Sequence, residues 1–426
     1  MIAPTSTTQT SGQSSGASLF RTADGRNHIV TFTLMCSLFL LWGFCSGLLD
    51  NLNKHFQNTL HISKFESGFV QNAFYMGYFI MALPAGIISR KFGYKGGIIA
   101  GLTIAAGGAF WLVHAGVLGT YYPFLCGLFV LALGLACLET NANPYTTVLG
   151  PLETGSLRIN MAQTCNGLGW ISGMLIGAYA IFPATQVVNA GDARLYVPYL
   201  GIGIAVAVLL FIFIPAKVPD LRAVEEVKGE AEGKTVKPIY KRSHFTLGVA
   251  AQFFYVAAQT GIFSYFINYA VVNINNLSDR HAGYIQAGAF GLFALGRLFG
   301  SAVVGLTKPH IALAIYAVIN TAMMILTMSC GGMAGVICLM ASFFFMSIMF
   351  PTIFALSIRG LGEHTKFGSS LLVMSIVGGA IASPVMGHIA DMHSMRTGFA
   401  LPLFCFVFIA IYGMFWQKLE SKDASA

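Results

Sequence analysis

The chain has 426 residues, of which 56% are apolar and only 9% are Asp, Glu, Lys or Arg. A soluble domain carries about 25% charged residues, and a disordered chain combines low hydrophobicity with high net charge, so both classes are excluded. Runs such as residues 311–326 are apolar on every side, whereas the strands of an outer-membrane barrel alternate between polar and apolar residues. The composition therefore predicts an all-α integral membrane protein.

The formal net charge of +8 does not indicate a nucleic-acid partner, because the basic residues are spread thinly between apolar segments and fit better as topology signals. The eight cysteines lie in apolar segments without a CxxC pair or a His-rich tract nearby, so we expect neither disulfides nor a metal site. HExxH, GxSxG and Walker motifs are absent from the sequence. The chain is therefore predicted not to be an enzyme and to need no cofactor.

Stretches of about 20 apolar residues, bounded by charges or by Gly and Pro, predict transmembrane helices. Twelve such spans cover residues 29–55, 66–89, 95–117, 120–149, 157–183, 195–215, 244–273, 281–305, 309–328, 333–358, 365–390 and 398–418. The only long charged stretch, residues 216–243, separates six spans from six. The predicted order is a disordered tail (1–28), a six-helix bundle (29–215), a linker (216–243), a second six-helix bundle (244–418) and a short tail (419–426).

An even number of spans places both termini and the linker on one side of the membrane. That side carries 18 Lys and Arg residues, and the other side carries five, Lys54, Lys64, Arg194, Arg280 and Arg396. Because loops rich in Lys and Arg stay in the cytoplasm, we expect a multi-pass protein of the inner (plasma) membrane whose termini and linker are cytoplasmic.

Small residues recur at matching places in the two halves. Gly77 and Gly86 match Gly291 and Gly300, and Gly169, Gly173 and Gly177 match Gly379, Ser383 and Gly387. Such residues let helices approach closely, and paired repeats are typical of transporters that rock about a central site. The pattern predicts two pseudo-symmetric bundles that work by alternating access.

Ionisable residues inside membrane spans are costly and are functional candidates by default. Asp50 lies in the first span, and pairing with Lys54 one helical turn further on is the alternative to a functional role. Arg297 lies in the eighth span, where we expect it to neutralise a carboxylate or to cap backbone carbonyls rather than to bind substrate.

Glu139 lies in the fourth span and is followed by Asn141, Asn143 and Pro144. This pattern predicts a polar and broken helix, which is tolerated in a membrane only beside a cavity or a protein partner. The alternative is a carboxylate at the cytoplasmic end of the helix.

Polar side chains recur at helical spacing in two further spans. They are Asn160, Gln163 and Asn166 in the fifth span, and Gln252, Tyr255 and Gln259 in the seventh. Each set lies on one helix face. Single amides often join membrane helices, but five amides near a carboxylate indicate a binding site.

These residue types suit a neutral sugar. Carboxylates and amides supply paired donors and acceptors for adjacent hydroxyls, and aromatic faces such as those of Trp42, Tyr75, Tyr78 and Tyr265 can cover the C–H face of a sugar ring. No cluster of cations accompanies them, which disfavours phosphorylated or strongly anionic substrates. The predicted substrate-binding residues are Asp50, Glu139, Asn143, Gln163, Asn166, Gln252, Tyr255 and Gln259.

A family resemblance rests on QNAFYMGYFIMALPAGIISRKFGYKGGIIAGL, GLACLETNANPYTTVLGP, LRINMAQTCNGLG, AQFFYVAAQTGIFSYFINYA and FPTIFALSIRGLG. Over about residues 30–415 the chain resembles the fucose–galactose–glucose:proton symporter family of the major facilitator superfamily, and most of all its L-fucose-transporting members. CLETxANP and xMAQTxN are the specific motifs. The resemblance implies a twelve-helix fold, proton and sugar handling by Asp50 and Glu139, and sugar contacts from Gln163 and Asn166.

Two departures from the family pattern are visible. The segment GIISRKFG has Arg90 where the superfamily usually has an acid, so the usual salt bridge of that loop lacks its acid. The L-fucose-transporting members have asparagines just before the acid of the first helix, which is Asp50 here. This chain instead has Ser46, Gly47, Leu48 and Leu49 before Asp50. Fewer polar groups there could change which sugar is accepted.

The sequence thus predicts a monomeric proton-coupled symporter that imports a neutral monosaccharide, such as L-fucose, galactose or glucose, across the lipid bilayer. Without an ATP site, uphill transport has to draw on an ion gradient, and Glu139 and Asp50 are the predicted proton-coupling residues. A passive sugar facilitator, a drug:proton antiporter and a transporter-like sugar sensor are the alternatives. A sensor would usually carry a long soluble domain, and a drug exporter an apolar cavity in place of clustered amides.

Overall fold

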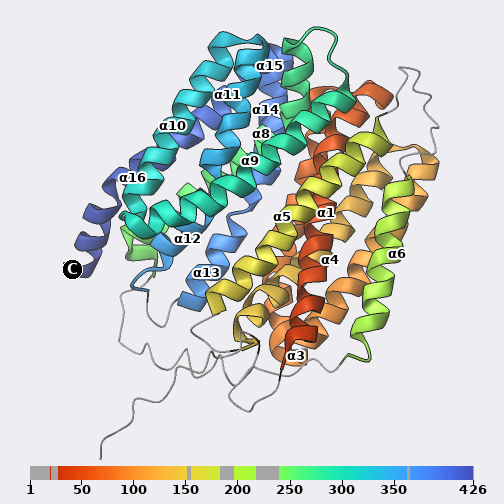
Figure 1. Cartoon of the computed structure of the whole chain (residues 1–426), viewed down its shortest axis with the longest axis vertical. Coiled ribbons are helices and arrows are strands. Elements are labelled where there is room, and N and C mark those ends of the chain that lie inside the picture. Colours follow the sequence, from red (N-terminus) through yellow and green to blue (C-terminus); the bar gives the residue numbers. More distant parts are fainter. Residues whose placement is uncertain are drawn as a thin grey trace, which may run out of the picture.

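The computed structural model describes residue 20 and residues 27–150, 155–182, 196–216, 239–361 and 365–425. The elements in these ranges are helices, arranged in two bundles that lie side by side (Figure 1). Most of the predicted N-terminal tail and of the predicted linker lies outside the described residues.

The N-terminal bundle contains α1 (Ile29–Leu60), α2 (Lys64–Ser67), α3 (Phe69–Leu118), α4 (Tyr121–Val148), α5 (Gly155–Ile181) and α6 (Tyr196–Phe213). The long α3 holds two of the predicted spans, because the chain turns at Gly93, where φ is 73° and ψ is 174°. Glycine adopts such a positive φ without steric cost because it lacks a Cβ atom.

The C-terminal bundle follows a short 3₁₀ turn, η2 (Ile239–Lys241). Its helices are α8 (Ser243–Asn273), α9 (Asp279–Leu306), α10 (Pro309–Cys330), α11 (Gly332–Met346), α12 (Met349–Ile358), α13 (Thr365–Met374), α14 (Val377–Met392), α15 (Met395–Gly398) and α16 (Ala400–Ser425). In the described part of the chain, nine helical segments are long and apolar enough to cross a membrane. With the second span of α3, and with α5 and α9, the helices match the twelve predicted spans.

Two spans that were predicted as continuous helices are broken. The span 333–358 divides into α11 and α12 at Ser347 and Ile348, because Pro351 has no N–H to donate to the Ser347 carbonyl and its ring crowds that group. The span 365–390 divides into α13 and α14 at Ser375 and Ile376, where the backbone makes tighter hydrogen bonds to the third preceding residue, such as Ile376 N to Val373 O at 3.1 Å.

The break predicted after Glu139 is wrong. Pro144 lies inside α4, which continues to Val148. Neighbouring polar groups can satisfy a carbonyl that loses its partner in a membrane helix. The carbonyl that Pro144 leaves without its usual donor is that of Thr140, four residues earlier. At the end of the helix, Nε of the buried Arg158 donates to the carbonyl oxygen of Thr146 at 3.0 Å and supports the last turn of α4.

The small residues of the repeat lie at close helix contacts. A Cβ atom added at Gly169 or Gly173 would collide with backbone atoms of α1. Gly379 and Gly387 of the C-terminal bundle instead lie against Tyr75 and Lys64 of the other bundle. The repeat therefore serves packing inside one bundle and packing between the two bundles.

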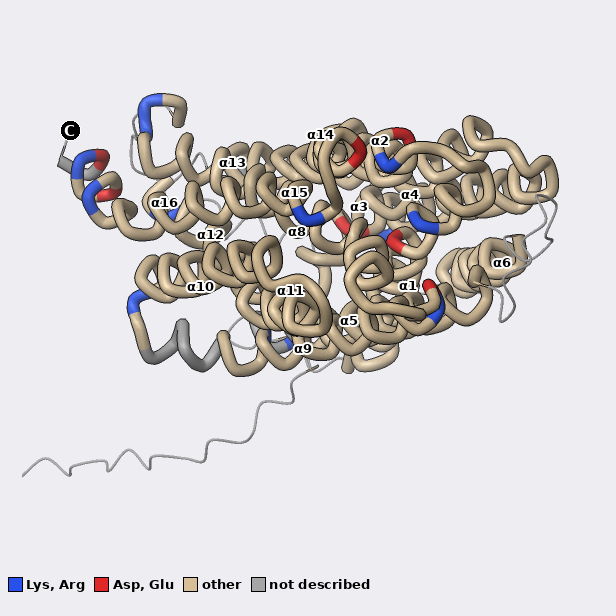
Figure 2. The backbone as a smooth tube through the Cα atoms, turned by 90° about the horizontal axis from the view of Figure 1, so that it is seen from above, with Lys and Arg blue, Asp and Glu red and all other residues tan. Residues whose placement is uncertain are grey.

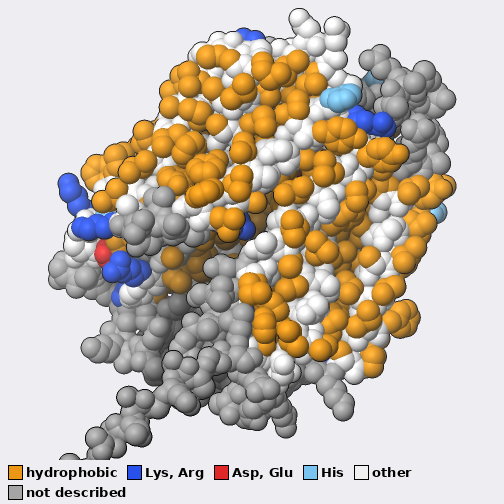
Figure 3. All heavy atoms as spheres, in the orientation of Figure 1, with side chains coloured by type: hydrophobic (Ala, Val, Ile, Leu, Met, Phe, Trp, Pro, Cys, Tyr) orange, Lys and Arg blue, Asp and Glu red, His pale blue; other side chains and the backbone are white. Residues whose placement is uncertain are grey.

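The boundary between the bundles, called the seam below, is formed by α1, α3 and α5 on one side and by α8, α9 and α14 on the other (Figure 2). We call the end of the molecule that carries α2 and α15 the α2 end, and the opposite end, where α6 ends and α8 begins, the linker end. On the face shown in Figure 3, hydrophobic side chains cover the middle of both bundles and most Lys and Arg lie near the margins. This distribution suits a surface that faces lipid.

Candidate substrate and proton site

Asp50 is buried on α1 in the seam, with 4% of its surface exposed. Its Oδ2 has no hydrogen-bond partner among the described residues, and the Gln71 amide of α3 interacts with the carboxylate. Lys54 reaches the other bundle instead, where its Nζ lies 3.9 Å from Oδ1 of Asp279 on α9. The alternative of an interfacial Asp50–Lys54 pair is therefore wrong.

Glu139 ends a short chain of amides inside the N-terminal bundle. Nδ2 of Asn143 lies 3.5 Å from Oε1 of Glu139, and Nε2 of Gln163 on α5 lies 3.3 Å from Oδ1 of Asn143. All three side chains are partly exposed. The chain thus directs N–H groups towards a carboxylate that solvent can reach.

Two tyrosines of α3 lie within electrostatic range of the acids. Tyr75 interacts electrostatically with both Asp50 and Glu139, and Tyr78 interacts with Glu139 and adjoins Trp42. The structure therefore holds two acids from distant parts of the sequence within electrostatic range of one tyrosine, together with aromatic faces of the kind that can cover a sugar ring.

Two of the predicted sugar contacts join helices in this conformation. Nδ2 of Asn166 donates to the carbonyl oxygen of Phe39 on α1 at 3.2 Å. The hydroxyl of Tyr255 donates to the carbonyl oxygen of Met346 at 3.0 Å. Met346 is the last residue of α11, so Tyr255 satisfies a carbonyl group at a helix end.

The two amides of α8 differ in their surroundings. Gln252 is fully buried, and neither atom of its amide has a hydrogen-bond partner among the described residues. A buried polar group without a partner costs about 1–3 kcal/mol, so Gln252 has unused capacity for a ligand. Gln259 is half-buried and adjoins Tyr255. The side chain of Asn160 lies outside the described residues.

Arg297 of α9 lies beside aromatic groups. Its guanidinium carbon lies 5.2 Å from the centre of the Phe293 ring, within the range of a cation–π interaction. It also interacts with Tyr255. These contacts anchor Arg297 on the C-terminal side of the seam.

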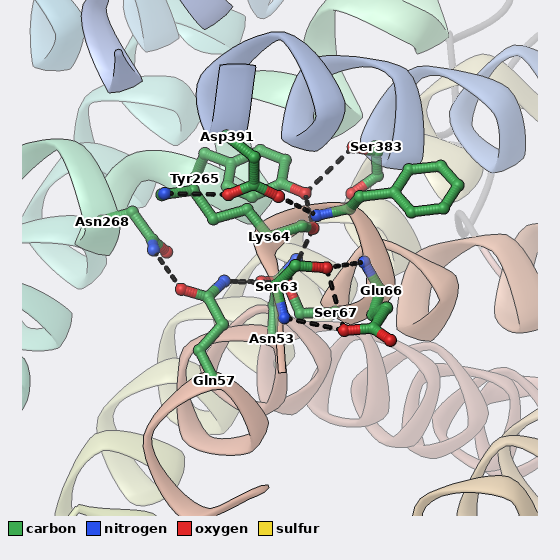
Figure 4. A network of polar contacts seen from close by, with 11 residues as sticks. Asn53, Gln57, Ser63, Lys64, Glu66, Ser67, Tyr265, Asn268, Ser383 and Asp391 are labelled. Carbon is green, nitrogen blue, oxygen red and sulfur yellow. Dashed lines mark hydrogen bonds and ion pairs between the residues drawn. The ribbon is translucent and has the colours of Figure 1, made fainter. Parts of the chain in front are cut away.

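A polar layer that was not predicted from the sequence closes the α2 end (Figure 4). Nζ of Lys64 and the backbone N–H of Phe65 donate to Asp391 of α14 at 3.0 and 2.8 Å. The hydroxyl of Tyr265 on α8 lies 2.7 Å from the carbonyl oxygen of Lys64 and 3.0 Å from that of Ser383. The layer therefore ties α2 to two helices of the other bundle.

Further contacts extend this closure across the seam. Nδ2 of Asn58 donates to Oδ2 of Asp279 at 2.5 Å, and Nε of Arg280 donates to the carbonyl oxygen of Phe182 at 2.9 Å. In the middle of these helices, the ring of Trp170 on α5 packs against Phe263 of α8, with 5.7 Å between the ring centres. Polar groups thus join the bundles at the α2 end, and aromatic rings join them deeper in the seam.

The sequence contained one signal for this layer. Lys54, Lys64 and Arg280 are charged residues in otherwise weakly charged segments. In the sequence all three indicate the topology, and Lys54 is also a possible partner of Asp50. Their partners lie in the other half of the chain, and no local pattern indicates which distant loops meet.

Comparison with known proteins agrees with this architecture. Residues 28–375 match the family model of the Major Facilitator Superfamily. The chain is 38% identical over 417 residues to the L-fucose-proton symporter of Escherichia coli (strain K12), which covers 93% of this chain and 95% of the relative. It is 35% identical over 400 residues to the glucose/galactose transporter of Brucella abortus biovar 1 (strain 9-941), covering 93% and 96% of the two chains.

Solved structures agree as well. The crystal structure of the Major Facilitator Superfamily transporter FucP in the outward conformation has 37% sequence identity and a TM-score of 0.69, covering 92% of this chain and 99% of that one. A D-xylose-proton symporter with 12% identity and a TM-score of 0.73, covering 92% and 98% of the two chains, shares the fold.

The two bundles and the polar seam define a multi-pass membrane transporter, not an enzyme. The chain belongs to the Major Facilitator Superfamily and, within it, to the family of the L-fucose-proton symporter and the glucose/galactose transporters. The predicted fold of twelve helices in two six-helix bundles and the predicted family are both confirmed.

Proposed function

We propose that the chain is a proton-coupled symporter that imports a neutral monosaccharide by alternating access. The observation that carries the proposal is the pair of carboxylates inside membrane-spanning helices, Asp50 on α1 and Glu139 on α4, both within electrostatic range of Tyr75 on α3. The relatives support the substrate class, since they are an L-fucose-proton symporter and glucose/galactose transporters.

The chemistry of the site explains how a proton could drive the sugar. A carboxylate in a partly dry seam has its charged form disfavoured, and protonation removes a charge that would oppose passage of the loaded site through an occluded state. Proton and sugar then favour the same conformational change. The proton is the coupling ion, and the cycle requires no further cofactor.

The proposed sugar contacts are the acids and the polar side chains near them. Asn143 and Gln163 offer partly exposed amides beside Glu139, and Gln252 offers a buried amide whose two atoms lack partners among the described residues. Asn166, Tyr255 and Gln259 complete the proposed set. An L-fucose-like sugar, galactose or glucose fits such a set of paired donors and acceptors.

The proposal includes an orientation. The transporter acts as a monomer in the inner (plasma) membrane, with the tails and the linker between residues 216 and 243 in the cytoplasm. The α2 end then faces outwards. Because the described contacts between the bundles gather at the α2 end, such as Lys64 with Asp391, this arrangement corresponds to a carrier closed to the outside.

Two experiments test the function. Purified protein is screened for binding of L-fucose, galactose, glucose, mannose and N-acetylglucosamine, and we expect at least one of the first three to bind. Glu139→Gln, a permanent mimic of the protonated acid, is then assayed in liposomes beside the wild type. We expect it to retain counterflow, which needs no proton release, and to lose proton-driven accumulation.

The pair of assays separates the possible roles of the acids. Retained pH-dependent accumulation in Glu139→Gln would remove Glu139 from the proton path and leave Asp50 as the coupling residue. Loss of both activities would indicate a structural or sugar-binding role for Glu139. A wild type whose uptake does not respond to a proton gradient would contradict symport and indicate a passive facilitator.

A further inference from the structure

A buried histidine lies at the linker end of the C-terminal bundle, where α16 also ends (Figure 1). His244 is the second residue of α8, and 2% of its surface is exposed. Nδ1 of its ring lies 2.8 Å from Oδ2 of Asp423 on α16, and Nε2 lies 3.0 Å from the carbonyl oxygen of Arg359, which follows α12. The ring therefore joins three segments of the chain, and we call this contact the His244 junction.

Backbone groups strengthen the His244 junction. The backbone N–H of His244 donates to Oδ2 of Asp423 at 2.9 Å. The hydroxyl of Tyr412 on α16 donates to the carbonyl oxygen of His244 at 3.1 Å, and the side chain of Arg242 donates to the carbonyl oxygen of Gly360. The start of α8 is thus tied both to α16 and to the residues after α12.

The partners of the ring fix how many protons the His244 junction holds. A carbonyl oxygen and an ionised carboxylate accept hydrogen bonds but cannot donate one, so Nε2 has to donate to the Arg359 carbonyl. The bond between Nδ1 and Oδ2 of Asp423 then needs a second hydrogen, carried by the ring or by the carboxyl group. In either case His244 and Asp423 together hold one proton more than a neutral imidazole and an ionised carboxylate.

The other charged groups on these segments are bonded to neighbours or exposed. Nε of Arg359 lies 3.1 Å from Oε1 of Glu420 on α16. Three lysines of the same segments are exposed: Lys241, Lys418 and Lys422. Among the described residues, Asp423 is therefore the acid that meets the His244 ring.

Loss of the extra proton would leave the His244 ring with one N–H group for two acceptors. The other ring nitrogen would then direct its lone pair towards an oxygen atom in a buried site, and a buried polar group without a partner is costly. The fastened junction binds one proton more than the released one. Its stability is therefore present at low pH and is lost as the pH rises.

We propose that the His244 junction is a proton-dependent latch, which fastens the end of α16 and the residues after α12 to the start of α8. The latch is closed at acidic pH on the linker side and opens as the pH there rises. Nε1 of Trp416 donates to the carbonyl oxygen of Leu356 at 3.2 Å without this proton, so opening releases the turns of α16 that follow Trp416. The latch goes beyond the proposed symport, since none of its residues belongs to the proposed sugar and proton site.

The test measures the distance between the end of α16 and the start of α8 as the pH changes. Ser421→Cys and Tyr240→Cys replace exposed residues and carry spin labels in the purified full chain without native cysteines. The labels are attached at a single pH. Double electron–electron resonance is then recorded from about pH 5 to about pH 9, a range that includes the usual charge change of histidine.

Three variants are compared with the otherwise unchanged labelled chain. His244→Gln and Asp423→Asn each remove one titrating partner of the latch. His310→Gln is the matched control, because His310 is a second buried histidine at the linker end that also contacts α16. Its ring stacks on Trp416, with 5.4 Å between the ring centres, and lies outside the latch.

The unchanged latch should release one proton as it opens. We therefore expect a longer-distance population to grow with pH, by up to about tenfold relative to the short-distance population for each pH unit. His244→Gln has no group in the latch that titrates in this range, so its distances should not depend on pH. In Asp423→Asn the amide can donate to Nδ1 of a neutral ring, which should also abolish the dependence. His310→Gln should titrate as the unchanged chain does.

Several outcomes would overturn the latch. One is a distance distribution that does not change with pH when the latch is intact. A pH response retained in His244→Gln and Asp423→Asn would assign the titration to other groups, and a response lost in His310→Gln would show that any altered contact of α16 removes it. If His244→Gln does not fold, Asp423→Asn decides alone. The measurement needs no sugar and no proton gradient, so failure of the proposed symport can be told apart from failure of the latch.

Discussion

The close approach of the two bundles at Gly68 offers a direct way to shift the conformational equilibrium. A Cβ atom added at this position would lie 2.7 Å from the backbone nitrogen of Pro384, and 2.8 Å from Pro384 Cα and from the carbonyl carbon of Ser383. All three atoms belong to the backbone of α14, so no flexible side chain can move away. Gly68 has φ −62° and ψ −19°, which alanine adopts without strain, so Gly68→Ala should fold.

The cost of Gly68→Ala arises only when the α2 end is closed. To reach ordinary van der Waals contact, α14 has to move away from α2, and such overpacking costs about 1–3 kcal/mol. When the α2 end is open, α14 and α2 are apart and the methyl group meets no backbone. We therefore expect the ratio of closed to open molecules to fall roughly 5- to 150-fold, since about 1.4 kcal/mol corresponds to a factor of ten.

Spin labels across the α2 end can measure this shift. Tyr122 at the start of α4 and Met392 at the end of α14 are both exposed, so Tyr122→Cys and Met392→Cys in a background without the native cysteines provide one label on each bundle. Double electron–electron resonance should show a longer distance population in Gly68→Ala. Gly86→Ala is the control, because a Cβ atom there would have no neighbour within 4 Å. An unchanged distance distribution in Gly68→Ala would refute the steric argument.

Three further predictions concern single positions. A cysteine introduced by Ser243→Cys in a background without native cysteines should resist impermeant thiol reagents in intact cells, and labelling from outside would reverse the proposed orientation. Gln163→Ala should weaken sugar binding by 5- to 150-fold, because it loses about 1–3 kcal/mol, and should leave the thermal stability unchanged. Asn166→Ala should instead lower the melting temperature in a thermal-shift assay, because the Asn166 amide joins α5 to α1. Asp391→Asn should shift the same spin-label distances less than Gly68→Ala, because a partly exposed ion pair contributes about 1 kcal/mol or less, and an equal shift would contradict this ranking.

Local patterns in the sequence were sufficient to predict the helices and to single out the two acids as candidates. A backbone inside a bilayer has to satisfy its hydrogen bonds within the segment, so each apolar run long enough to span the membrane forms a helix whatever its neighbours are. Asp50 and Glu139 stood out for a related reason, since a carboxylate in an apolar span is costly and is retained for a purpose. Helix order and the paired bundles were therefore predictable from the sequence, and the functional role of these two acids stays a prediction.

Helix breaks depended on tertiary surroundings. Pro144 predicted a break that does not occur, since α4 continues to Val148, and Arg158 from a neighbouring segment supports the last turn of this helix. The interruption near Ser347 has a sequence signal in Pro351, whereas hydropathy gives no sign of the interruption near Ser375. Whether a helix tolerates a missing hydrogen bond is decided by the groups packed against it.

Polar partners depended on how the two bundles meet. The sequence offered Lys54 as the neighbour of Asp50, yet Lys54 pairs with Asp279 of the other bundle. Gln57 likewise accepts a hydrogen bond from Asn268, which is more than 200 positions away in the sequence. A side chain with several possible partners takes the one that its surroundings bring within hydrogen-bond distance, so the sequence determined which residues could form the site, and only the docking of the bundles decided which of them pair.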